Sequence, residues 1–600
     1  MNISRMKIEN FRNFSDFDVA LNGNIVVVGE NRVGKSNLMY ALQLLFDPGL
    51  PDSARQLTLA DFWDGLGDIG SEDKITIMVE IVNFESDLDL LAILTDFRVD
   101  SDPQTVRLTY EFRPKPSLEN EPTSEDDYEF ICYGGESETK RFGHDLRRRI
   151  RLDLLPALRD AEGELANWRR SPLRTLLERA FSSIDREDLD EIREAMEGAT
   201  DKLTEFESVE KLEGQLKELF TEMSGPKQDV KLNLGVATTS LAHIYRNIKL
   251  LIDEGRRSIS DASLGSANLV LLTLKALELQ LQIDENSRDH TIFAIEEPEA
   301  HLHPHLQRSV YRHLFMTFAN GENKNALSII LTTHSPHIAS IAPLSSLLLL
   351  KDTEDGTIGH STARISLTDA DVEDLERYLD VTRAEMLFSR GVILVEGDAE
   401  KFLVPVFAKT LGHNLDYLGI TVCSVSGTNF TPYVKFFSAL GIPFAVITDW
   451  DPAGKNRPRG INRSKQLVLV SEEIRSGSSQ KGLRGELNQL LEQEGEIVFC
   501  NRCEDFGIFT NYHTLEVDLF NDGFHEEIIA TLNEQRWGSK RKGWIEEWSA
   551  DKSMLDVDIY LRLIETIGKG RFAQRLASRV SGMKPPKYIQ KAVEYVVSRV

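Results

Sequence analysis

Three groups of acidic residues in the second half of the sequence could hold divalent cations. Each lies at or just past the end of an apolar segment that resembles a β-strand, as in "GVILVEGDAE" and "FAVITDWD". The groups are Glu396 with Glu400, Asp449 with Asp451, and Glu516 with Asp518. Parallel strands end at one edge of a sheet, so we expect these side chains to converge there. Solvated strand ends would explain any one group, but three gathered groups favour neutralisation by Mg²⁺ or Mn²⁺.

A phosphate-binding loop is indicated near the start of the chain. The stretch "GENRVGKS" (Gly29–Ser36) matches GxxxxGK[ST] and lies between the apolar run "IVVV" and a helical segment. Its backbone N–H groups would surround the phosphates of ATP, Lys35 would reach the β and γ oxygens, and the Ser36 hydroxyl would bind Mg²⁺. The residues of this segment expected to bind the nucleotide are Gly29, Asn31, Gly34, Lys35, Ser36 and Asn37.

Three further segments supply the other elements of an ATPase. The apolar run in "TIFAIEEPEAHLHPHL" leads into Glu296, expected to hold the water shell of Mg²⁺, and Glu297, expected to orient the attacking water. The segment "LSIILTTHSP" is a second buried strand that ends at His334, where an imidazole would sense the γ-phosphate. Ser263 and Gly265 of "SLGS" lie at the predicted N-terminus of a helix, which favours anion binding.

The elements that must position these residues alternate between strands and helices, which predicts an α/β fold with a parallel sheet. Six hundred residues exceed one hydrophobic core, so we expect several domains. Residues 156–223 instead repeat apolar residues at three- and four-residue steps, which indicates a helical insertion. The predicted divisions are 1–150 and 229–370 for the two parts of the ATPase, 151–228 for the helical insertion, 371–390 for a helical bridge, and 391–600 for a second α/β domain with a helical C-terminal region.

Composition suits a soluble protein of a reducing compartment. The net charge of −27 argues against a surface coated in basic residues but allows a local basic groove. Four cysteines are too few for a disulfide framework, and the lone CxxC of Cys500 and Cys503 has no second pair of zinc ligands at a suitable spacing. The charged N-terminus and the lack of a long apolar run predict a cytoplasmic protein without a membrane segment.

In the order phosphate loop, "SLGS", "EEPE" and His334, the first half resembles an ABC-type ATPase head of the RecF-like kind. In such heads the signature serine of one subunit commonly completes the ATP site of another. The resemblance therefore implies a homodimer or a higher homo-oligomer, with the helical insertion as a candidate dimer surface. The same resemblance places His301, His303 and His305 in a loop that needs no metal, although zinc is the alternative for three such histidines.

The second half is similar to a Toprim domain, because "VILVEGDAE" is followed by "DWD". An ABC head followed by a Toprim domain resembles the OLD (overcoming lysogenization defect) family of nucleases, which includes the nuclease subunit of the Gabija anti-phage system. The resemblance spans nearly the whole chain and extends to "VSGTNF", "TLEVDL" and "GKGRFAQRLA". It implies ATP and Mg²⁺ or Mn²⁺ as cofactors, metal-dependent cleavage of DNA, and a role in anti-phage defence.

The resemblance also implies roles for single residues. Glu396, Asp449 and Asp451 would hold one metal ion. Glu400 and Asp518, with Glu516, would hold a second, and two such ions activate the attacking water and stabilise the leaving oxygen. Lys569 of "GKGRFA" looks like the family's catalytic lysine, which would stabilise the phosphorus centre or the leaving group.

Local basic charge indicates where an acidic protein would contact DNA. The segment 452–471 has five basic residues and no acids, and residues 531–600 have 14 Lys and Arg against 8 Asp and Glu. The five are Lys455, Arg457, Arg459, Arg463 and Lys465. The alternative function is a RecF-like ATP switch that binds DNA without cutting it. A helicase-like or retron partner, found with some relatives, is left open.

Overall fold

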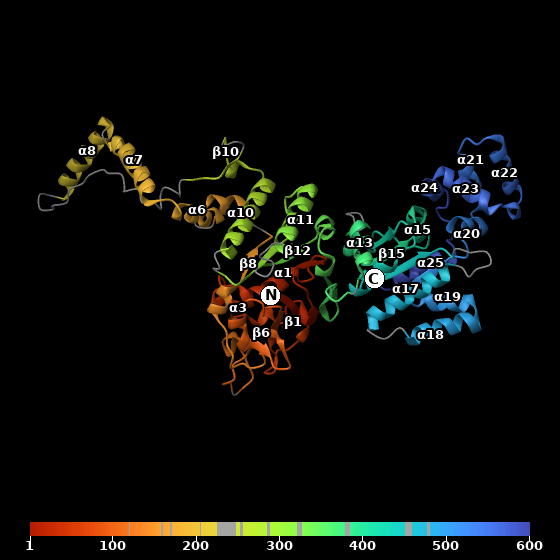
Figure 1. Ribbon diagram of the computed structural model, residues 1–600, viewed down its shortest axis with the longest axis horizontal. Helices are drawn as coiled ribbons and strands as arrows, with labels where there is room; N and C mark the ends of the chain where they lie inside the picture. The colour runs from red at the N-terminus through yellow and green to blue at the C-terminus, as the bar shows by residue number, and fades with distance from the viewer. Residues whose placement is uncertain are drawn as a thin grey trace. The chain divides into compact units, whose positions relative to one another are not determined.

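The computed structural model describes most of the chain in two compact units, whose elements are labelled in Figure 1. The described residues are 1–118, 120–157, 160–168, 171–204, 206–224, 248–252, 256–284, 288–320, 327–365, 367–378, 384–450, 459–476 and 481–600. The first unit consists of Met1–Pro156, Asp289–Glu299 and Pro304–Val600, and the second of Ala157–Arg288 and Ala300–His303. The predicted α/β class is confirmed, because the first unit contains two sheets of mainly parallel strands beside one antiparallel sheet.

The N-terminal half of the first unit holds an antiparallel and a mainly parallel sheet. The antiparallel sheet has the order β2-β1-β4-β6-β5, and β7 also pairs with β6. Its strands are β1 (Asn2–Phe11), β2 (Phe14–Ala20), β4 (Ile75–Val82), β5 (Arg98–Val99), β6 (Asp102–Pro114) and β7 (Tyr128–Gly134). One hydrophobic core joins this sheet to the helix that follows the phosphate loop, with Phe11, Phe14 and Phe17 fully buried.

The parallel sheet of this half carries the ATPase segments. Its order is β14-β13-β3-β12-β11-β8, and only β14 runs antiparallel to its neighbour. The strands are β3 (Ile25–Gly29), β8 (Ile150–Leu155), β11 (His290–Glu296), β12 (Leu327–Thr333), β13 (Leu347–Thr353) and β14 (Gly356–Ser361). The accompanying helices are α1 (Lys35–Phe46), α2 (Asp52–Arg55), α3 (Leu88–Leu94), α4 (His144–Arg149), α11 (Pro304–Asn320), α12 (Pro336–Ala339) and α13 (Asp369–Tyr378). Because β3, β11 and β12 are neighbours, the loops at their carboxyl ends share one edge.

The C-terminal half of the first unit is built on a four-stranded parallel sheet of order β16-β15-β17-β18. Its strands are β15 (Gly391–Val395), β16 (Ile420–Ser424), β17 (Phe444–Thr448) and β18 (Ile508–Thr510). Its helices are α15 (Asp398–Thr410), α16 (Thr431–Ala439), α17 (Arg459–Ser476), α18 (Lys481–Gln489), α19 (Glu496–Glu504), α20 (Leu515–Asn521), α21 (His525–Asn533), α22 (Ser539–Ala550), α23 (Val557–Ile567), α24 (Lys569–Arg579) and α25 (Lys587–Val597). β15 and β17 are fully buried, as expected for central strands covered on both faces.

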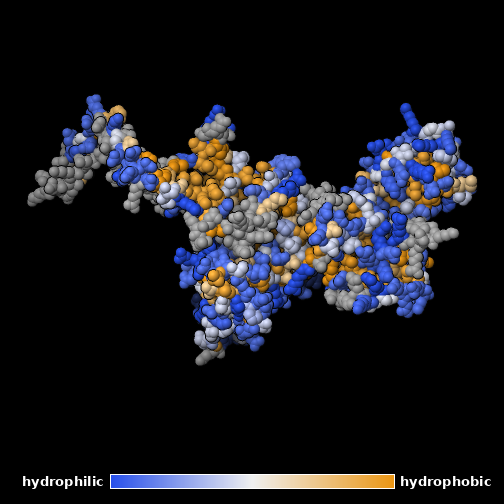
Figure 2. Space-filling model, viewed as in Figure 1, coloured by the Kyte–Doolittle hydropathy of each residue, from blue (hydrophilic) through white to orange (hydrophobic). Residues whose placement is uncertain are grey.

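The second unit is helical, as the period of residues 156–223 predicts. Its elements are α5 (Ala161–Ala166), α6 (Pro172–Ser182), α7 (Arg186–Thr204), α8 (Glu207–Ser224), β9 (Leu251–Ile252), β10 (Arg257–Ser258) and α10 (Leu264–Asp284). Figure 2 shows hydrophobic residues gathered around α10, where Leu264 and Leu277 are 50% and 44% exposed. Among the described residues, α10 is also the single helix long and apolar enough to cross a membrane. That is weak evidence for a span, because core helices of soluble proteins have the same composition.

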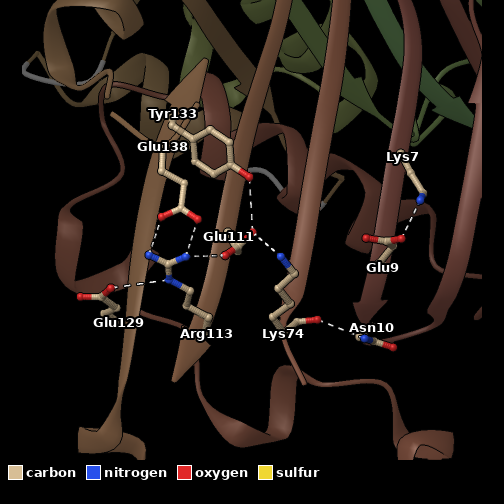
Figure 3. A network of polar contacts seen from close by, with 9 residues as sticks. All are labelled: Lys7, Glu9, Asn10, Lys74, Glu111, Arg113, Glu129, Tyr133 and Glu138. Atoms are coloured by element: carbon tan, nitrogen blue, oxygen red, sulfur yellow. Dashed lines mark hydrogen bonds and ion pairs between the residues drawn. The ribbon is translucent and has the colours of Figure 1, made fainter. Parts of the chain in front are cut away.

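A network of charged side chains fastens the antiparallel sheet (Figure 3). At its centre the Glu111 side chain is 1% exposed. It accepts hydrogen bonds from Lys74 Nζ at 2.8 Å and Arg113 Nη1 at 3.1 Å, and the Tyr133 hydroxyl lies 3.4 Å away. The carboxylate thus links β6 to β7, and to Lys74, the residue before β4.

Replacing this carboxylate should loosen the sheet locally. We expect Glu111→Ala to cost about 2 kcal/mol, because it removes charge-assisted hydrogen bonds while leaving Arg113 half-enclosed. Hydrogen exchange of the β6 and β7 amides would measure the change. The control Glu129→Ala removes a 34% exposed partner of the same arginine and should change stability by less than about 0.5 kcal/mol. Equal effects of the two substitutions would contradict the central role of Glu111.

Candidate functional site

The phosphate loop has the conformation that its glycines predict. Gly29 and Gly34 have φ angles of 157° and 89°, and a Cβ at Gly29 would lie 2.8 Å from the Leu350 carbonyl oxygen. Lys35 Nζ donates to the carbonyl oxygens of Gly29 at 3.1 Å and Glu30 at 2.7 Å. Burial lowers the pKa of Lys35 to about 8, although Glu297 and Glu299 oppose the shift. The loop is therefore curled around the ammonium that would meet the phosphates.

The other nucleotide-binding residues of this segment lie at the start of α1. Ser36 is exposed, as a Mg²⁺ ligand must be, and Asn31 is exposed in the loop. Asn37 is held by its neighbours: its amide donates to Asn13 Oδ1 and its Oδ1 accepts from Arg12 at 2.8 Å. Asn37, which the sequence predicts to bind the nucleotide, thus also fixes the start of α1 to the β1–β2 hairpin.

The acidic segment after β11 lies beside the end of β12. Glu297 has a φ of 41°, an uncommon conformation for a residue other than glycine, and its Oε1 lies 3.8 Å from His334 Nε2. Burial and the nearby Lys35 lower the pKa of His334, which favours a neutral imidazole. Glu296 ends β11 and is half-buried. Glu297 and His334 thus face each other across neighbouring strand ends.

Glu299 holds the loop at this site and was not identified in the sequence analysis. Its carboxylate accepts hydrogen bonds from the Thr333 hydroxyl at 2.8 Å and the His334 backbone N–H at 2.6 Å. Glu299 therefore fixes the loop that presents His334. The third acid of "EEPE" was the available signal, because a carboxylate that follows two strand-end acids and is enclosed by the fold needs a local partner.

The "SLGS" residues belong to the second unit. Ser263 lies just before α10, where its Oγ accepts from the Ser266 backbone N–H at 3.2 Å. A Cβ at Gly265 would lie 2.5 Å from the His301 carbonyl oxygen, so only glycine permits this approach. The segment is thus a capped helix start packed against the loop after the acidic segment.

Two of the predicted acidic strand ends, those after β15 and β17, lie next to each other, whereas Glu516 and Asp518 lie in the helix α20 and not at a strand end. Glu396 directly follows β15, and its Oε1 accepts from the Thr448 hydroxyl at 2.6 Å and from the Asp449 backbone N–H at 2.8 Å. Glu400 lies in the first turn of α15 and caps it, because its Oε2 accepts from the Gly397 N–H at 3.2 Å. The first two acidic groups are therefore joined by hydrogen bonds across β15 and β17.

Burial and repulsion by neighbouring acids make Glu400 and Asp449 hard to ionise. Burial is the main cause that raises the pKa of Glu400 to about 7, and Glu516 and Glu396 add to it. Burial likewise raises the pKa of Asp449 to about 8, with Glu396, Glu400 and Glu516 adding to it. Four carboxyls thus lie within electrostatic reach of one another. This donor set suits a divalent cation, which would remove the repulsion.

Glu516 and Lys569 reach the edge from two helices. Glu516 lies in the first turn of α20, a short loop after the strand β18. Its Oε1 is 3.4 Å from Lys569 Nζ, at the first residue of α24. Desolvation alone would lower the pKa of Lys569, but Glu516, with Asp449 and Glu400, raises it instead. The lysine is therefore charged and points at the carboxyl cluster.

Asp518, unlike the other acids, holds a loop together through backbone hydrogen bonds. Its Oδ2 accepts from the backbone N–H groups of Tyr512 at 2.8 Å and His513 at 3.3 Å, which closes the loop between β18 and α20. Burial raises the pKa of Asp518, and its two backbone hydrogen bonds oppose the shift. Asp451 lies outside the described residues. Within the described part of the chain, no three His, Cys, Asp or Glu side chains converge as a finished metal site, the histidines at 301, 303 and 305 included.

Two polar residues at this edge, one half-buried and one buried, were not identified in the sequence as partners of the acids. Arg463, counted above among the DNA-contacting basic residues, instead bonds Glu396 Oε1 at 2.7 Å with a side chain only 14% exposed. Asn511 donates to Asp449 Oδ1. Of the other basic residues of that segment, Arg459 is exposed, Lys465 bonds Asn488, and Lys455 and Arg457 lie outside the described residues.

Two domain families match this sequence. Residues 25–340, just over half of the chain, match the family described as "AAA domain, putative AbiEii toxin, Type IV TA system". Residues 387–451, which include β15, Glu396 and β17, match the family described as "Overcoming lysogenization defect protein-like, TOPRIM domain". The matched segments contain the phosphate loop and the first two acidic groups.

Two named relatives match most of this chain. The protein is 25% identical to the OLD nuclease of Thermus scotoductus, over 75% of this chain and 82% of that one. It is 21% identical to endonuclease GajA of Bacillus cereus, over 87% of this chain and 89% of that one. A solved structure, the C-terminal region of the Burkholderia pseudomallei OLD protein, is 37% identical, covers 35% of this chain and 98% of that chain, and gives a TM-score of 0.30. The chain belongs to this AAA family of P-loop ATPases and, with the Toprim domain that follows, to the OLD family.

Proposed function

We propose that this OLD-family nuclease is a DNA endonuclease that depends on Mg²⁺ or Mn²⁺ and is regulated by ATP at its ATPase domain. The observation that carries the proposal is the gathering of Glu396, Glu400, Asp449 and Glu516 with Lys569 at one sheet edge. Buried carboxyls with raised pKa values at one strand edge are typical of a cation-dependent catalytic site. A RecF-like switch without cleavage would not need them.

The chain's own residues divide into cation ligands and a phosphate-binding group. Glu396, Glu400 and Asp449, with Asp451, are the proposed ligands, and Glu516 and Asp518 are proposed to complete the set. Bound there, the cations would activate water and neutralise charge on the phosphate. Lys569, held by Glu516 at 3.4 Å, is placed to donate to a phosphate oxygen or the leaving oxygen. At the ATPase site, Lys35 and Ser36 would bind the phosphates and Mg²⁺.

The proposed partners follow from charge and from exposed apolar surface. DNA is the proposed substrate, with Arg459 and the C-terminal helices as contacts, because residues 531–600 carry 14 basic against 8 acidic side chains. A homodimer is the proposed assembly, because the helices of the second unit expose large apolar residues. A role in anti-phage defence is proposed from the family alone.

Control of cleavage by ATP has a physical route in the contact between the phosphate loop and β15. Arg390, the residue before β15, bonds Glu30 of the phosphate loop through Nε at 2.7 Å and Nη2 at 3.0 Å. Its own N–H donates to the Gly419 carbonyl, which anchors it to the Toprim sheet. Glu396 follows the other end of the same strand. If the phosphate loop moves when ATP binds, the strand that presents Glu396 would therefore be displaced as well.

The bridge between the domains also lines the nucleotide pocket. Glu385 and Phe388 border a pocket of about 500 Å³ together with Asn31 and His334. Nucleotide binding would therefore press on the segment that leads into β15. We propose that this segment and the Arg390–Glu30 pair transmit the state of the ATP site.

A stability measurement tests the cation site without relying on cleavage. In chelator at about pH 8, Asp449→Asn should raise the unfolding midpoint by about 2–4 °C, because it removes the cost of holding a partly ionised carboxyl in a buried acidic cluster. Since the folded pKa of Asp449 is raised to about 8, wild-type stability should fall as the pH rises toward that value, and the variant should lose less. Mn²⁺ should stabilise the wild type much more than the variant. The exposed control Asp522→Asn should behave as wild type.

Nicking of supercoiled plasmid tests the activity itself. Wild-type protein should nick in Mg²⁺ or Mn²⁺ but not in chelator, and Glu396→Ala and Asp449→Ala should each lower the rate at least about 100-fold. Lys569→Ala should lower the rate about 10²- to 10³-fold, since it removes the positive group beside the phosphate. Nicking that survives both carboxylate substitutions would come from a contaminant and would leave the RecF-like switch as the function.

The regulatory route predicts a variant that separates the two activities. Arg390→Gln should keep ATP hydrolysis and nucleotide-free nicking but lose the change in nicking rate that ATP causes. Lys35→Ala should lose hydrolysis itself, because the phosphates lose their cation. The control is Arg364→Gln, an exposed arginine with no recorded contact to the phosphate loop among the described residues. An unchanged ATP response in Arg390→Gln would rule out this route.

A further inference from the structure

One oxygen of Glu396 is fully occupied by hydrogen bonds. Oε1 accepts from the Thr448 hydroxyl at 2.6 Å, the Asp449 N–H at 2.8 Å and Arg463 Nη1 at 2.7 Å. A carboxylate oxygen offers about two lone-pair sites, so three donors saturate it. Oε2 receives no hydrogen bond from any described residue. The two oxygens of Glu396 therefore differ: three protein donors bind Oε1, whereas no described residue donates to Oε2.

Asp449 is divided in the same way. Asn511 Nδ2 donates to its Oδ1, and Asn511 is only 4% exposed. The orientation of this amide is set by its other end, because Asn511 Oδ1 must accept the Trp450 backbone N–H at 2.7 Å. The NH₂ group is thus forced to face Asp449. One oxygen of the second carboxylate is held by Asn511, and the other accepts no hydrogen bond from the part of the chain that the structure describes.

The approach of Arg463 is built into the backbone of α17. This helix begins at Arg459, and a Cβ at Gly460 would lie 2.8 Å from the Asp449 carbonyl oxygen and 2.9 Å from Trp450 Cα. Only glycine lets the helix start so close to the end of β17. One turn further along, Arg463 reaches back over the same strand end and also donates to Thr448 Oγ1 at 2.5 Å and the Asp449 carbonyl at 3.2 Å.

We propose that Arg463 and Asn511 are positioning residues that turn Glu396 Oε2 and Asp449 Oδ2 toward the divalent cation. Each occupies the other oxygen of its carboxylate, so that each acid offers the cation one oxygen in a fixed direction. The inference rests on the cation site of the proposed function. It adds the two residues that orient its ligands.

The sign of an effect on cation affinity distinguishes this role from simple electrostatics. A positive guanidinium beside a cation site repels the cation, so removing its charge alone should tighten binding. Removing a group that orients a ligand weakens binding instead, typically about 10- to 100-fold. The two interpretations therefore predict opposite changes in cation affinity when Arg463 is replaced.

The test is the affinity of the full-length protein for Mn²⁺, measured by isothermal titration calorimetry. Arg463→Met should bind Mn²⁺ about 10- to 100-fold more weakly than wild type, and Arg463→Lys, which keeps one donor, should recover part of the loss. The matched control is Arg459→Met, which removes the same charge one turn earlier and should bind as tightly as wild type or tighter. Asn511→Leu should weaken binding in the same direction as Arg463→Met. Unfolding midpoints measured alongside identify any variant that has lost its fold.

Each other outcome overturns the inference in a recognisable way. If Arg463→Met binds Mn²⁺ as well as wild type or better, Arg463 does not position a ligand. If its Mn²⁺ affinity is unchanged but its affinity for DNA falls, Arg463 is a phosphate contact. If wild-type protein binds no Mn²⁺ and nicks no DNA, the proposed function fails and this inference fails with it.

Discussion

Like-charged carboxyls crowded at the end of one parallel sheet are the constraint on which the rest of the Toprim domain depends. Glu396, Glu400, Asp449 and Glu516 repel one another in a site that is largely closed to water, and burial raises the pKa values of Glu400 and Asp449. Such a cluster costs stability unless positive charge and donors are supplied. Arg463, Lys569, Thr448 and Asn511 supply them, each from a different element. The acidic cluster thus lowers the stability of the folded protein at the site where the proposed cation chemistry needs negative charge.

The two halves of the first unit follow the same structural rule. In each, a fully buried parallel strand delivers acidic or phosphate-binding residues to its carboxyl end. β15 connects the two sites, because Arg390 before it contacts the phosphate loop and Glu396 after it belongs to the acidic cluster. A strand bonded along its length to two neighbours is a stiff element for passing on a small displacement.

Local patterns were enough to predict the strands, the phosphate loop and the strand-end acids, since each is encoded within about ten residues. Lys569 needed the family resemblance, because the docking of α24 at the sheet edge depends on packing that has no local signal, and Glu516 was expected at a strand end but lies in the helix α20. Arg463 was assigned to the basic DNA-contacting group because its charge is evident in the sequence, whereas its partner lies 67 positions away. The roles of Asn511 and Glu299 were hard to predict from the sequence, because a single buried hydrogen bond leaves no repeating pattern.

The most direct test of the central claim is anomalous diffraction from crystals of the full-length protein grown with Mn²⁺. We expect an anomalous peak at bonding distance from Glu396 Oε2 and an oxygen of Asp449, with Glu400 or Glu516 beside it. A peak only at the phosphate loop, or no peak at the sheet edge, would show that these carboxyls do not share a cation and would contradict the account.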